Sequence, residues 1–70
     1  MPLTMATVGR GQVVKEIHGK DEVIAHLKNL GFVKGAEVEV VSFLAGNVIV
    51  NVKGTRVALD KAMAQRIMVI

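Results

Sequence analysis

The sequence predicts a mainly β domain in which five short strands and one α-helix close into a small, partly open barrel. Three observations predict this fold class. Thirteen Val and five Ile make up about a quarter of the chain, and β-branched side chains favour strands. One segment alone has the apolar spacing of a long amphipathic helix. The 70 residues are about half of the ~150 that a typical domain takes, so residues 1–70 are predicted to form a single domain.

The first two elements are a strand at Gln12–His18 and a helix at Asp21–Leu30. Apolar and polar side chains alternate along the strand, and apolar ones recur every three or four residues along the helix. Gly31 stands where a helix C′ glycine is expected, because that position needs a positive φ. In this arrangement the next residue packs back on the last turn, so Phe32 is expected to contact Leu27.

Tight turns separate the remaining elements. Gly35 fits the third position of a type II turn after Lys34. Along the strand Glu37–Leu44 the alternation reverses from Val41, which predicts a bulge or a curled strand that is covered on both faces. Ala45-Gly46-Asn47 is expected to be a hairpin turn. The other strands are expected at Val48–Lys53, Thr55–Leu59 and Ile67–Ile70, and one helical turn, capped by Asp60, at Lys61–Arg66. This turn is too short for the second long helix of a ferredoxin-like fold.

Composition and charge exclude several classes of protein. The chain has no cysteine, which rules out disulfides and thiolate metal sites. Its net charge is +3, but the basic residues form no run and acidic ones interleave with them, which is typical of a solvated, mixed-charge surface. Without Trp or Tyr, and with Phe32 and Phe43 both predicted to pack internally, stacking on nucleic-acid bases and binding of Pro-rich peptides are disfavoured.

No apolar stretch approaches the ~20 residues that cross a bilayer, and the N-terminus lacks the pattern of a signal peptide. We therefore expect a cytoplasmic protein that does not insert into a membrane. Catalytic chemistry is not indicated either, because Ser42 lies mid-strand, far in sequence from either histidine. Gly9-Arg10-Gly11 reads as a turn, since it lacks the spacing of a phosphate-binding loop.

Two kinds of binding site remain open at this point. His18, Glu22 and His26 lie near one end of the predicted helix, and such N/O ligands suit Fe²⁺, Zn²⁺ or Mn²⁺. We interpret them first as solvated surface residues, with a metal site as the alternative. Val41, Phe43 and Ile49 fall on nominally outer strand faces. They are either covered by the curled chain itself or form a docking patch.

The chain resembles the FeoA family of ferrous iron transport proteins in three segments and in their order. These segments are His26–Val41, Asn51–Leu59 and Ala64–Val69. These segments are similar to the family patterns L-x-x-L-G-[LF]-x-x-G-x-x-[VI]-x-V, V-x-G-x-x-[VI]-A-L and A-x-x-I-x-V. The resemblance covers nearly the whole chain. Many relatives carry Pro where this chain has Lys34, a position of the turn that tolerates Lys. Many also have a longer loop in place of Ala45-Gly46-Asn47.

The resemblance implies an SH3-like barrel and a non-enzymatic, cytoplasmic accessory of FeoB, a membrane transporter with a GTP-binding domain. No resident cofactor is expected, and transient contact with Fe²⁺ or another divalent ion stays open. The docking surface is predicted at His26, Phe32, Val33 and Lys34. The resemblance also implies kinship with the C-terminal domain of diphtheria-toxin-repressor-type regulators, so a metal-binding or metal-sensing module is the alternative function. A nucleic-acid-binding barrel is a further, less favoured one.

Overall fold

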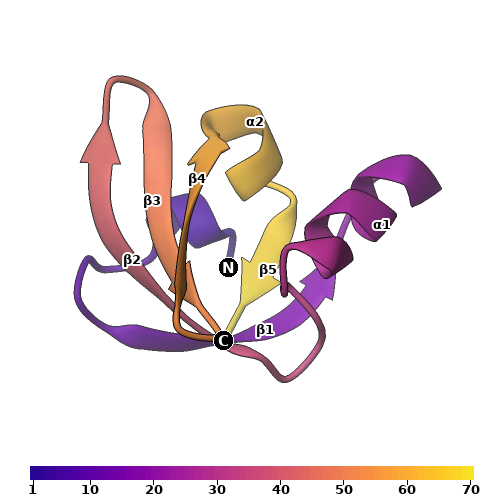
Figure 1. Ribbon diagram of the computed structural model, residues 1–70, viewed down its shortest axis with the longest axis horizontal. Coiled ribbons are helices and arrows are strands. Elements are labelled where there is room, and N and C mark those ends of the chain that lie inside the picture. The colour runs from indigo at the N-terminus through magenta and orange to yellow at the C-terminus, as the bar shows by residue number, and fades with distance from the viewer.

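The β-rich segments form one antiparallel sheet of five strands, which curls around the core (Figure 1). The computed structural model describes residues 1–70. Along the sheet the strand order is β4-β3-β2-β1-β5, so the last strand returns to lie beside the first. The elements are η1 (Leu3–Met5), β1 (Gly11–Ile17), α1 (Asp21–Asn29), β2 (Glu37–Leu44), β3 (Asn47–Val52), β4 (Thr55–Asp60), α2 (Lys61–Ala64) and β5 (Ile67–Val69). The predicted fold class, five strands with one main helix, is confirmed.

The turn between β2 and β3 is tighter than the sequence predicts. Ala45 and Gly46 have φ values of 50° and 83°, and Asn47 already pairs with Leu44. The hairpin turn therefore has two residues, as in type I′ turns, and not the predicted three. Of the two structures predicted for the polarity reversal in β2, the bulge is confirmed, because the pairing register with β3 shifts between Val40 and Ser42.

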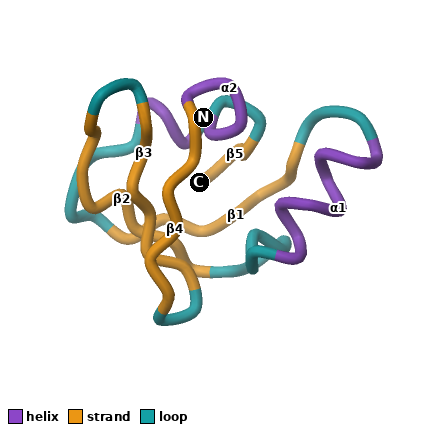
Figure 2. The backbone as a smooth tube through the Cα atoms, turned by 45° about the horizontal axis from the view of Figure 1, so that its top comes forward, coloured by secondary structure: helices purple, strands orange, loops and turns teal.

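The end of α1 has the predicted glycine geometry. Gly31 has a φ of +110°, and its N–H donates to the Lys28 carbonyl at 3.0 Å. The Phe32 N–H donates to the Leu27 carbonyl at 3.0 Å, which completes a Schellman motif. Leu27 and Phe32 are both fully buried in the core. Figure 2 shows that α1 lies beside the end of β1 at one side of the molecule, with the β2–β3 hairpin at the opposite side.

The core is aliphatic apart from one aromatic ring. Its fourteen buried residues are Leu3, Ala6, Val14, Leu27, Phe32, Val38, Val40, Val48, Val50, Val52, Leu59, Ala64, Ile67 and Val69. Most of them alternate along strands, as expected for one inward face of a curled sheet. The prediction that both phenylalanines pack internally is wrong for Phe43, whose exposed fraction is 49%. It lies near the end of β2, where only the short hairpin turn follows.

The N-terminus lies along β5. The amino group of Met1 donates to the Val69 carbonyl at 2.9 Å, and the Val69 N–H donates to the Met1 carbonyl at 2.7 Å. Pro2 forms a bridge with Met68, and Leu3 is fully buried. The first residues therefore cover the edge of β5 that β1 leaves free.

The helical turn after β4 is shorter than predicted and ends at Ala64, but the predicted cap is present, with Asp60 Oδ1 accepting from the Met63 N–H at 2.8 Å.

Candidate functional site

The predicted docking surface is brought together only in part. His26 and Lys34 are exposed and Val33 is half-buried. Phe32 has no exposed surface, because the Schellman motif turns its ring into the core. The prediction that Phe32 belongs to the docking surface is therefore corrected. The residue stabilises the fold and cannot contact a partner while the domain is folded.

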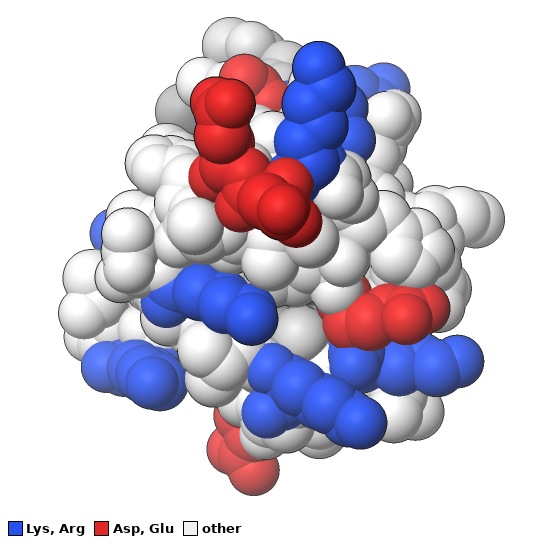
Figure 3. All heavy atoms as spheres, turned by 90° about the vertical axis from the view of Figure 1, so that its right-hand side faces the viewer, with Lys and Arg blue, Asp and Glu red and all other residues white.

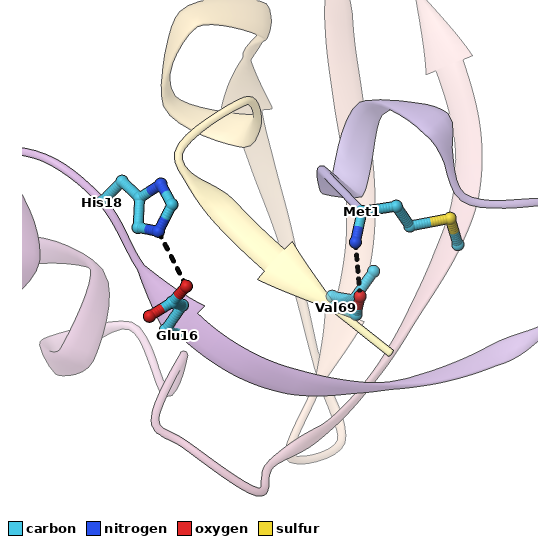
Figure 4. A network of polar contacts seen from close by, with 4 residues as sticks. All are labelled: Met1, Glu16, His18 and Val69. Carbon is cyan, nitrogen blue, oxygen red and sulfur yellow. Dashed lines mark hydrogen bonds and ion pairs between the residues drawn. The ribbon is translucent and has the colours of Figure 1, made fainter.

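The three candidate metal ligands lie on two elements. His18 follows β1, Glu22 lies in the first turn of α1, and His26 in its last turn. The structure contains no group of three or more His, Asp or Glu side chains placed to hold a metal ion. His18 instead pairs with Glu16 of β1, with Nε2 at 2.9 Å from Oε1 (Figure 4).

The surroundings of Glu16 lower the pKa of its carboxyl group. The hydrogen bond from His18 lowers the pKa of Glu16 most, and the charge of His18 lowers it further. Lys15 and Lys34 act in the same direction by their positive charge. The carboxylate is exposed, so water screens all of these interactions. Lys15 of β1 and Lys34 of the turn after α1 line the same hollow as Glu16.

Three lysines from three parts of the chain surround a hollow between β1 and α1. We call this hollow, of about 270 Å³, the lysine groove. It is lined by Lys15, Glu16, Ile17, Ile24, Lys28 and Lys34. The isoleucines are half-buried and the charged residues are exposed. On the face seen from the α1 side, basic side chains spread across the lower half and others stand beside acidic ones at the top, while further acidic side chains lie at the right and at the bottom (Figure 3). The sequence alone does not predict that these three lysines lie together, because they are dispersed along the chain.

Two other hollows lie on the barrel. One, of about 300 Å³, lies at the β2–β3 hairpin, where the exposed Phe43 and Leu44 face Thr4 and Lys61. The other, of about 460 Å³, is lined by Gly11 of β1 and by neighbouring residues of β2 and β3, Glu39 among them. All three hollows are open to solvent on a domain of only 70 residues.

No helix of the chain has the length and apolar character needed to cross a membrane.

The curled five-stranded sheet, with α1 packed beside β1, defines the chain as a small SH3-like barrel. A family model for the FeoA domain matches residues 1–70. The chain therefore belongs to the FeoA family, whose members are non-enzymatic accessory proteins associated with ferrous iron transport.

Individual relatives agree with this assignment. An Fe²⁺ transport protein A from Methanocaldococcus jannaschii is 31% identical over 68 residues, which is 97% of this chain and 83% of the relative. The crystal structure of FeoA from Stenotrophomonas maltophilia in complex with zinc, described as an SH3 domain protein, is 33% identical, with a TM-score of 0.87 over 100% of this chain and 89% of that one. The crystal structure of an iron uptake regulatory protein, FeoA, is 32% identical, with a TM-score of 0.90 over 99% and 92%.

The likeness extends, for the fold alone, to larger regulators. A manganese-dependent transcriptional repressor has a TM-score of 0.90 at 20% identity. This chain covers 40% of the repressor, so the barrel corresponds to one part of it. The predicted kinship with metal-dependent regulators is confirmed at the level of fold only.

Proposed function

We propose that this protein assists ferrous iron uptake by docking on the cytoplasmic part of a FeoB-type GTP-binding transporter and modulating it. The observation that carries the proposal is the FeoA match over the whole chain, residues 1–70. Relatives are named for Fe²⁺ transport and for regulation of iron uptake. The shallow surface of the barrel is consistent with a role in contacting a larger protein.

The contact surface is proposed on the α1 side of the barrel. His26, Val33 and Lys34 remain as candidates after the removal of Phe32, since each has exposed surface. Val33 and Lys34 belong to the turn that the Ala36 N–H closes by donating to the Val33 carbonyl at 2.9 Å. A hydrogen-bonded turn presents its side chains at low entropic cost on binding.

A titration of the transporter's cytosolic GTP-binding domain with this chain tests the proposal. The domain is immobilised in three states, nucleotide-free, GDP-bound and bound to a non-hydrolysable GTP analogue, and binding is followed by biolayer interferometry. We expect saturable binding in at least one state and a change in the rate of GTP hydrolysis. A folded chain that binds none of the three states contradicts the proposal.

Divalent-metal binding is a second candidate function, favoured by the zinc complex of the relative from Stenotrophomonas maltophilia. In this chain the ligands would be His18, His26 and Glu22. The structure does not bring them together as a metal-holding group, so binding through them requires these side chains to move, and His18 to leave Glu16. Anaerobic calorimetry with Fe²⁺ and with Mn²⁺ tests this ligand set. If these residues bind the metal, the parent protein should saturate at one ion per chain, and the His26→Ala variant should give no binding heat. Equal binding by the parent and by His26→Ala excludes the set.

A further inference from the structure

The lysine groove has a positive rim that its one lining carboxylate, Glu16, offsets only in part. Its three ammonium groups face one carboxylate, so the groove carries about +2 of the chain's net charge of +3. The ion pair in the structure joins Glu16 to His18, and none of the three lysines has a carboxylate within 4.0 Å. The carboxylate is thus engaged with His18 while the lysines stay free for a ligand.

The floor of the groove is apolar. Ile17 of β1 and Ile24 of α1 are only half-buried, and Lys28 lies one helical turn after Ile24 on the same side of α1. The volume of about 270 Å³ is just below the ~300–1,000 Å³ of pockets that enclose small molecules. The hollow therefore suits one apolar side chain of a protein segment better than a whole nucleotide.

We infer that the lysine groove docks an acidic segment of the transporter, with an apolar side chain on the isoleucines and carboxylates beside the lysines. This inference rests on the proposed function and adds the chemistry of the contact. Charge complementarity is the argument for the occupant, since an acidic segment pairs three lysines that repel one another in the free protein. The contact is exposed, so its affinity falls as salt rises.

Charge reversal at matched positions tests the inference. The groove variant changes Lys15, Lys28 and Lys34 to Glu, and the control variant changes Lys20, Lys53 and Lys61 to Glu, which are exposed and line no part of the groove. Both variants have the same net charge and the same number of substitutions, and circular dichroism checks that both fold. We expect the groove variant to bind the transporter's GTP-binding domain at least ~10-fold more weakly than the control variant.

A single substitution tests the same idea in the opposite direction. Glu16→Gln removes the acidic group of the groove, and we expect it to strengthen binding by roughly 2- to 5-fold at low salt. Glu37→Gln, at an exposed glutamate of another hollow, is the control and leaves the affinity within about twofold. Equal affinities of the two charge-reversal variants, or no gain from Glu16→Gln, would overturn the inference while leaving the proposed docking intact.

Two further probes separate the inference from the proposed function. The first is a synthetic peptide with one leucine between two pairs of glutamates, compared with its glutamine counterpart by ¹⁵N NMR. Shifts confined to the lysine groove, seen only with the glutamate peptide, show that the groove takes an acidic segment. If the transporter domain itself then fails to bind, the proposed function fails while the chemistry of the groove stands. The second probe is a vesicle with anionic phospholipid. Groove-dependent binding to the vesicle, without binding to either protein probe, means that the ligand is a membrane and rejects the acidic segment.

Discussion

The two phenylalanines provide a matched pair for testing what holds the barrel together. Phe32 is fully buried and Phe43 has an exposed fraction of 49%. Replacing a buried Phe by Ala costs about 3–5 kcal/mol, because the transfer free energy and the cavity both count. At Phe43 about half of the ~1.5–3 kcal/mol for full burial is at stake, and no closed cavity forms, so we expect a loss of about 0.8–1.5 kcal/mol.

The size of the domain makes this difference decisive. At ~0.05–0.15 kcal/mol per residue, 70 residues give a free energy of unfolding of about 4–10 kcal/mol. Phe32→Ala therefore removes roughly 30% or more of the stability. Phe32→Leu gives a measurable variant if the alanine variant does not fold. Urea unfolding followed by far-UV circular dichroism is the assay, since the chain has no Trp or Tyr for fluorescence. Equal losses in the two alanine variants would refute the assignment of Phe32 to the core.

Three other predictions concern the turns and the Glu16–His18 pair. Asp60→Ala removes the side-chain acceptor of the α2 cap and should cost about 0.5–2 kcal/mol in urea unfolding. Gly31→Ala should lower the free energy of unfolding by at least ~1 kcal/mol more than Gly9→Ala. Both glycines have a positive φ, but an added Cβ at Gly31 would lie 3.2 Å from Val52 Cγ2, whereas one at Gly9 would meet nothing within 4 Å. The pKa of Glu16, followed by NMR of its carboxyl carbon, should lie below 4.5 and rise in His18→Ala. Because the folded state has the lower pKa, this pair stabilises the fold above the unfolded pKa and ceases to do so as pH falls through the folded value. A pKa unchanged by His18→Ala would contradict the hydrogen bond.

Local signals in the sequence predict most of the fold. The glycine after α1 and the aspartate before α2 each have one physical reading, and the polarity reversal in β2 has two. The structure contains the C′ glycine, the bulge and the cap. Each of these features is settled by residues within about six positions of one another. The boundaries that differ, such as Asn47 at the start of β3, depend on whether a residue next to a turn also pairs across the sheet.

The candidate site was harder to predict, because it depends on packing between distant segments. Lys15 and Lys34 are 19 positions apart in the sequence, and only the packing of α1 and its following turn beside β1 brings them to one groove. The prediction that Phe32 belongs to the docking surface was wrong for a different reason. The glycine signal already predicted its contact with Leu27, and a side chain in that contact cannot also face a partner.

A single substitution at Lys34 can distinguish the contribution of this residue to stability from its contribution to binding. Lys34 stands at the second position of the type II turn, where Pro is favoured, and its N–H makes no backbone hydrogen bond. Val33 before it is β-branched and suits the extended conformation that precedes Pro. Lys34→Pro should therefore keep or raise the free energy of unfolding, by up to ~1 kcal/mol, because it restricts the unfolded chain. It also removes one positive charge from the lysine groove, so affinity for the transporter domain should fall about 2- to 5-fold, whereas Lys61→Gln leaves it unchanged. A Lys34→Pro variant that is at least as stable as the parent and binds equally well would show that the turn supports only the fold and that its lysine takes no part in docking.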